Sequence, residues 1–106
     1  MKSHDFIDIA RMILEADAQA RERAADEASD HVGAYTSAQA SALATLLAAT
    51  AVSEKESSAL EAELHAIIEL TSTGHVDRDH LSPLREINLG DLPPQLRDYV
   101  SDLLEG

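Results

Sequence analysis

Two histidines and two aspartates lie within six positions of the sequence, in the order His75-Val-Asp77-Arg-Asp79-His80. Imidazole nitrogens and carboxylate oxygens are ligands that zinc accepts. With one more ligand from elsewhere in the chain, for example His65, these side chains could hold a metal ion and activate water for hydrolysis. The stretch is therefore the first candidate for chemistry in this sequence.

The same stretch also has the composition of a turn between two helices. Gly74 suits the left-handed conformation that often ends a helix, and Asp77 suits an N-cap, whose side chain accepts hydrogen bonds from free backbone N–H groups. A calcium-binding loop beginning at Asp77 would have Ser82 in place of the required glycine and Asn88 in place of the bidentate glutamate. We therefore expect a capped turn in which His75, Asp77, Asp79 and His80 bind no metal.

Other catalytic patterns are missing from the sequence. It contains no G-x-S-x-G nucleophile elbow, no glycine-rich loop for a phosphate group and no cysteine. Glu61 and Glu69 lie eight positions apart without the E-x-x-H motif of a di-metal helical bundle. We therefore expect a protein that is not an enzyme, with no catalytic residue and no cofactor.

Apolar residues recur at helical spacing, and no run alternates apolar with polar residues as a half-buried strand would. The pattern predicts an all-α fold, a compact helical bundle of four to five helices that forms a single domain over residues 1–106. The expected helices cover residues 4–30 and 37–51, a third reaches Gly74 from a capping box at Ser53 and Glu56, a short one begins at Ser82, and the last ends near Leu104.

The segment 31–53 has no charged residue, but its many serines and threonines do not suit a membrane span. We expect it to contain the most buried helix of the bundle. The N-terminus has no uninterrupted apolar run, because Asp5 and Asp8 interrupt it, so we expect no signal peptide. Together with the lack of cysteine, which fits a reducing compartment, this favours the cytoplasm.

The chain is strongly acidic, with 20 Asp and Glu against 8 Lys and Arg and a net charge of −12. Residues 54–106 carry twelve acids and four bases, whereas residues 1–53 carry eight acids and four bases. Such a charge repels nucleic acid and anionic membranes, and it attracts basic proteins and speeds their association. We expect a basic protein partner, with no nucleic acid and no membrane.

A small, cysteine-free, strongly acidic helical domain without a catalytic motif resembles the bacterial immunity proteins, which neutralise toxin domains by binding them. Helical immunity proteins of nuclease colicins carry paired tyrosines beside acidic residues, and Asp98-Tyr99 supplies one such tyrosine here. The resemblance implies an inhibitor that covers the active or substrate-binding surface of a basic toxin domain of the nuclease type. The contact residues it implies are Glu54, Glu61, Glu69, Asp91, Asp98, Tyr99, Asp102 and Glu105.

An alternative function also fits this composition. Ala16, Ala20 and Ala24 recur along one face of the predicted helix 4–30, and small side chains let two helices approach closely. The chain could then be an acidic helical adaptor or secretion chaperone that acts through homo-oligomeric helix packing, with a homodimer formed through this helix.

Overall fold

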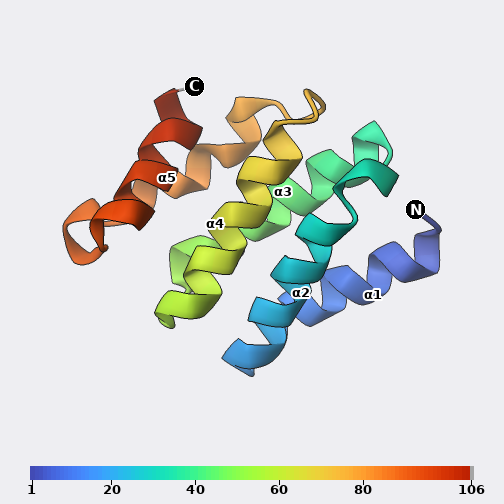
Figure 1. The fold of residues 1–106 in the computed structure, drawn as a ribbon, viewed down its shortest axis with the longest axis horizontal. Coiled ribbons are helices and arrows are strands. Elements are labelled where there is room, and N and C mark those ends of the chain that lie inside the picture. The colour runs from blue at the N-terminus through green and yellow to red at the C-terminus, as the bar shows by residue number, and fades with distance from the viewer. Residues whose placement is uncertain (106) are drawn as a thin grey trace.

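Two layers of helices make up the part of the chain that the computed structural model describes, residues 1–105 (Figure 1). It consists of helices and the segments that connect them, with no strand among these residues, so the predicted all-α fold is confirmed. The α-helices are α1 (Ser3–Ile13), α2 (Ala18–Asp30), α3 (Ser37–Ser53), α4 (Ser57–Thr71) and α5 (Pro94–Glu105). The 3-10 helices are η1 (Val32–Ala34), η2 (Arg78–Glu86) and η3 (Leu89–Asp91).

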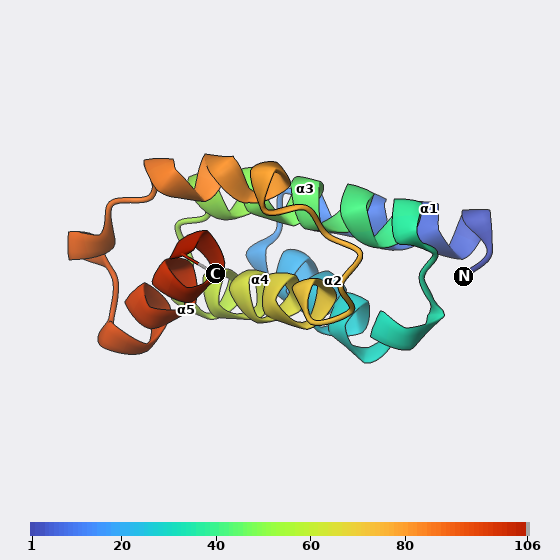
Figure 2. The same ribbon diagram turned by 90° about the horizontal axis from the view of Figure 1, so that it is seen from above.

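Figure 2 shows the layers edge-on: α1, α3 and η2 form one, and α2, α4 and α5 form the other. The core lies between them, where Leu43 and Leu47 of α3 and Leu64 and Ile67 of α4 are fully buried. From α2 only alanines reach the core, namely Ala24, Ala25 and Ala28. Since the distance between packed helices depends on the side chains at their contact, these alanines allow α2 to lie close against α4.

The predicted helix 4–30 is wrong as a single element, because the chain bends between α1 and α2. α1 ends at Ile13, and Asp17 begins α2 as its N-cap, accepting a hydrogen bond from the backbone N–H of Gln19. The bend lays α2 back on α1, so that both helices contribute to one core.

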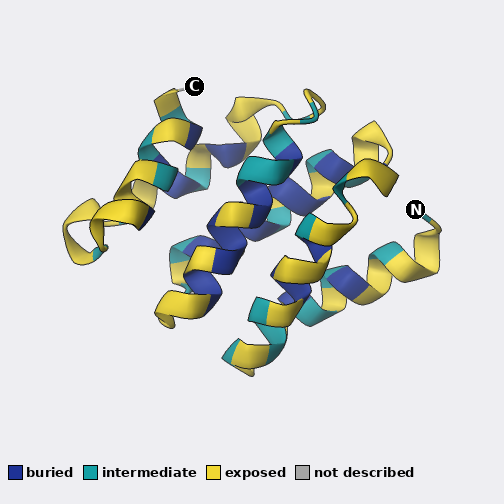
Figure 3. Ribbon diagram, viewed as in Figure 1, coloured by how far each residue is buried: buried dark blue, intermediate teal, exposed yellow. Residues whose placement is uncertain are grey.

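α4, and not α3, is the most buried helix among the described residues (Figure 3). It buries eight of its 15 residues, whereas α3 buries six of its 17. α4 lies between α2 and α5 and over α3 (Figure 1), while one side of α3 faces solvent. The uncharged sequence of α3 therefore does not mean burial on all sides. No helix within residues 1–105 is both long enough and apolar enough to cross a membrane.

The connection from α3 to α4 differs from the predicted capping box. Ser53 is the last residue of α3, and Glu56 is the N-cap of α4 but makes no side-chain capping bond. Instead, the Glu54 carboxylate accepts hydrogen bonds from the backbone N–H groups of Lys55 and Glu56, at 3.1 and 3.2 Å. A carboxylate beside the N-terminus of a helix also interacts favourably with the helix dipole.

Arg21 of α2 connects the α1–α2 bend to the α3–α4 connection through hydrogen bonds. Its Nε and Nη2 donate to the two carboxylate oxygens of Glu54 at 2.7 and 2.8 Å, and its Nη1 donates to the backbone oxygens of Glu15 and Ala16 in the α1–α2 bend. The Glu54 side chain is completely buried and that of Arg21 is 19% exposed. Because the hydrogen bonds from Arg21 stabilise the charged carboxylate, the pKa of Glu54 is lowered to about 2.

We predict that Arg21→Met destabilises the protein, because it removes the positive partner of the buried Glu54 carboxylate and the donor to two backbone oxygens. Urea unfolding at pH 7 measures the effect. Arg23→Met is the matched control, since Arg23 is exposed on the same helix, and it should change the free energy of unfolding by no more than about 0.5 kcal/mol. Equal effects of the two substitutions would contradict a structural role for the ion pair.

Candidate functional site

The histidines of the stretch 75–80 fasten this segment to α3. His75 Nδ1 shares a hydrogen bond with Ser37 Oγ at 3.2 Å, and His80 Nδ1 shares one with Ser41 Oγ at 2.8 Å. Since the two serines are four positions apart on α3, they lie on the same face of the helix. The stretch therefore fixes the start of η2 against α3.

The predicted capped turn is present in this segment. Gly74 has a positive φ of 79°, and the Asp77 side chain accepts from the backbone N–H of Asp79 at 2.9 Å as the N-cap of η2. η2 continues through Ser82 and Pro83, so these residues do not begin a separate helix. Within residues 1–105, no three His, Asp or Glu side chains are grouped so that they could hold a metal ion.

We predict that calorimetric titration with zinc gives no binding heat near one-to-one stoichiometry, because the imidazoles bond separately to two serines of α3. The His75→Ala, His80→Ala double variant is the control. Submicromolar zinc binding by the wild type that disappears in this variant would contradict the prediction and revive a hydrolytic function.

Charge is divided between the two layers of the fold. α2, α4 and α5 together carry ten acids and three bases, whereas α1, α3 and η2 carry four acids and three bases. The negative field is therefore concentrated on the layer formed by α2, α4 and α5. Comparing residues 1–53 with residues 54–106 does not reveal this division, because α2 lies in the first half of the sequence and α4 and α5 lie in the second.

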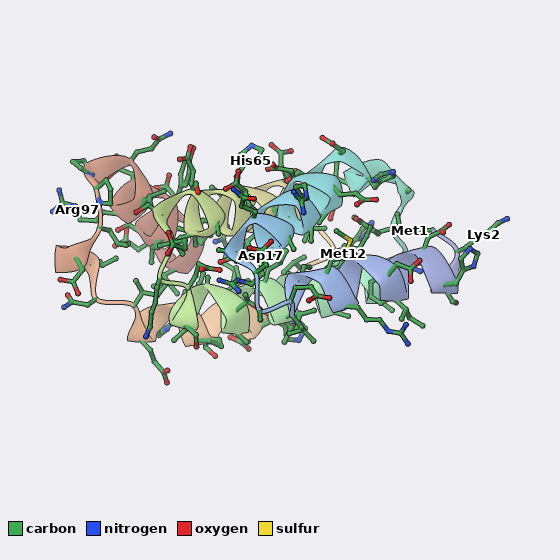
Figure 4. The ribbon with its side chains drawn as sticks, turned by 90° about the horizontal axis from the view of Figure 1, so that it is seen from below. Met1, Lys2, Met12, Asp17, His65 and Arg97 are labelled. Atoms are coloured by element: carbon green, nitrogen blue, oxygen red, sulfur yellow. The ribbon has the colours of Figure 1, made fainter. Side chains whose placement is uncertain are left out.

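A groove on the acidic layer brings together side chains from its three helices. Glu22 and Asp26 come from α2, Glu61 and His65 from α4, and Tyr99 from α5. We call this set the acidic groove. Figure 4 shows His65 on the outer side of this layer. The groove is a concave surface that is acidic on the α2 side and has an aromatic ring on the α5 side.

The electrostatics of the acidic groove follow from crowding of like charges. Partial burial, together with repulsion from Glu22 and Asp30, raises the pKa of Asp26, while the nearby His65 acts in the opposite direction. His65 Nε2 lies 3.4 Å from a carboxylate oxygen of Glu69. A positively charged group that entered the groove would relieve this repulsion, so the site is suited to bind lysine or arginine side chains.

Of the contact residues predicted from the sequence, Glu61 and Tyr99 line the acidic groove and Glu69 lies beside His65. Tyr99 is half-buried, and its hydroxyl accepts a hydrogen bond from Gln95 Nε2 at 2.9 Å. The remaining acids of α5 are exposed and recur at intervals of four and three, which places them on one face of the helix. They are Asp98, Asp102 and Glu105.

Glu54 and Asp91 lie apart from this groove. The Glu54 side chain is buried against Arg21. The prediction that this side chain contacts a partner is therefore wrong. Asp91 is exposed in η3, outside the groove residues. A carboxylate before a helix is as suited to an internal ion pair as to a binding surface, and only the position of Arg21 decides between them.

Glu22 and Asp26 were missed by reasoning from the sequence. Their spacing of four, continued by Asp30, is a signal that the sequence contains, since such residues share a face of a helix. Both residues lie in the less acidic half of the chain, so the charge distribution along the sequence does not single them out. What the sequence could not indicate is that this face of α2 lies beside Glu61 of α4.

The alanine stripe expected on the first helix is not a continuous exposed surface. Ala24 is fully buried against the core, Ala20 is partly buried, and Ala16 lies in the bend before α2. The small residues of α2 serve instead to bring α2 close to α4 within one molecule. Ala16, Ala20 and Ala24 therefore do not form a continuous contact surface for a homodimer.

Comparison of the chain with protein-family models, with curated proteins and with solved structures found no match.

Proposed function

We propose that this protein is an inhibitor of the immunity type, which binds a basic toxin domain of the nuclease class and covers its active or substrate-binding surface. The acidic groove between α2, α4 and α5 is the observation that carries the proposal. A nuclease binds its substrate with lysine and arginine, and these are the groups that crowded carboxylates attract. In this proposal the protein acts by binding alone, in the cytoplasm, without catalysis or a cofactor.

The groove provides the two kinds of contact that a tight interface needs. Glu22, Asp26 and Glu61 supply negative charge, which steers a basic partner and sets the rate of association. Tyr99 supplies a half-buried aromatic ring at one side. Aromatic side chains in partly desolvated pockets commonly contribute much of the binding free energy.

We predict that Asp26→Asn with Glu61→Gln slows association with the cognate toxin domain and changes dissociation little. Rapid-mixing kinetics at low and physiological salt measure this, since the Debye length falls from about 30 Å to about 8 Å over that range. The cheapest partner to test is the product of the neighbouring gene, if it has a basic C-terminal domain. Inhibition of its nuclease activity provides the functional readout.

Asp8→Asn with Glu86→Gln is the matched control, because it removes the same charge from exposed positions of the other layer. Tyr99→Ala should instead speed dissociation and cost about 2 kcal/mol or more of binding free energy. Binding that is indifferent to salt, or equally slowed by both charge variants, would exclude the groove as the contact surface.

A second function is favoured by a different surface. The outward side of α3 exposes Ala38, Ala42, Thr45 and Ala49, at intervals of four, three and four, and α3 carries no charged residue. In the same layer, Ile7 and Leu14 of α1 are 45% and 65% exposed. Since this layer carries little net charge, two copies could meet here with their acidic layers outward, as a homo-oligomeric adaptor or secretion chaperone would require.

For this second function we predict that the wild type sediments as a dimer and that Ala42→Glu sediments as a monomer, because the new carboxylate would be buried without a partner. Ser58→Glu is the control, since Ser58 is exposed on the acidic layer. A wild-type protein that is monomeric at high concentration in sedimentation equilibrium would remove the support for the second function.

A further inference from the structure

Glu63 of α4 is a carboxylic acid inside the core. Its exposed fraction is 0%, and among residues 1–105 it is the only polar or charged residue that is buried as a whole, backbone included. Neither of its carboxyl oxygens has a hydrogen-bond donor from another residue. An ionised carboxylate without a donor is strongly unfavourable in such a place, and a buried acid commonly becomes neutral instead.

The charged groups that act on Glu63 are Glu54 and Arg21. Glu54 comes from the α3–α4 connection and Arg21 from α2, whereas α3 has no charged residue to contribute. Arg21 already uses four of its five N–H groups, two on Glu54 and two on backbone oxygens of the α1–α2 bend. It therefore neutralises one carboxylate and has little capacity to serve a second.

Two ionised carboxylates beside one arginine carry an excess negative charge, which disappears when one of the two carboxylates is protonated. A protonated Glu63 has an O–H that can donate to the neighbouring Glu54 carboxylate, which together with burial raises the pKa of Glu63. The cluster then has no net charge. Glu54 is the partner that stays ionised, because it receives the two hydrogen bonds from Arg21.

We propose that the buried Arg21–Glu54–Glu63 cluster is a proton-dependent clamp between α2 and α4: the folded chain holds one proton between the two carboxylates, and losing it loosens the packing of these helices. The same two helices present Glu22, Asp26, Glu61 and His65 on their outer side. The cluster therefore lies between the same two helices whose outer sides line the acidic groove.

The direction of the pH effect follows from linkage. Burial, with the neighbouring Glu54, raises the pKa of Glu63 from 4.5 to about 9 in the folded protein. Between those pH values the folded state binds a proton that the unfolded state lacks, so stability falls as the pH rises. Glu54, with its lowered pKa, acts oppositely and loses its contribution as the pH falls from 4.5 towards about 2.

The test is the free energy of unfolding of the whole chain, measured in urea from pH 5 to pH 9. For the wild type we expect the folding equilibrium constant to fall with rising pH, by up to about tenfold per pH unit for one proton. Glu63→Gln keeps the shape, stays neutral and can donate to Glu54, so it should remove this slope. Glu61→Gln, an exposed position two residues away, should keep the slope.

Equal slopes in the wild type and Glu63→Gln would overturn the clamp. A direct measurement on the wild type covers the case in which Glu63→Gln does not fold. An NMR titration of the side-chain carboxyl carbons should find Glu63 protonated at pH 7 and titrating only at alkaline pH. A Glu63 carboxyl that is ionised at pH 7 would overturn the proposal.

Discussion

The bidentate ion pair between Arg21 and Glu54 is the constraint on which the rest of this fold depends. It joins residues 33 positions apart, and through Glu15 and Ala16 it also holds the bend between α1 and α2. α2 buries only alanines, and alanine provides little apolar area to fix a helix in place. The ion pair adds the directional contacts that the alanines lack. It holds the bend after α1, the position of α2 and the connection that leads into α4.

A polar cluster of this kind has a consequence that an apolar contact would lack. Breaking one partner of a buried pair leaves an uncompensated charge, so the arrangement tolerates few alternatives. The buried Glu63 belongs to the same cluster, where burial and the neighbouring Glu54 raise its pKa. In the proposed clamp, one proton helps to hold the inner sides of α2 and α4 together, while the outer sides of these helices line the acidic groove.

The candidate site could be predicted in part from the sequence. Acidity, the absence of catalytic motifs and Tyr99 beside acids were visible, and Glu61 and Tyr99 do line the groove. The partners of Glu61 were not visible, because Asp26 belongs to a helix distant in sequence that only packing brings alongside α4. For Glu54 the sequence predicted a contact residue, because an acid in a polar connection is usually exposed. In the structure an arginine from another helix covers its side chain.

The sequence by itself determined the all-α class, the turn with Gly74 and the Asp77 cap, and the negative charge. These features follow from helical periodicity, capping and composition, which act over a few residues. The tertiary structure alone decided the bend at residues 14–17, the central position of α4, the exposed side of α3 and the burial of Glu63. Each of these depends on which helix faces which, and that choice is a balance of packing and desolvation over the whole chain, which no local pattern contains.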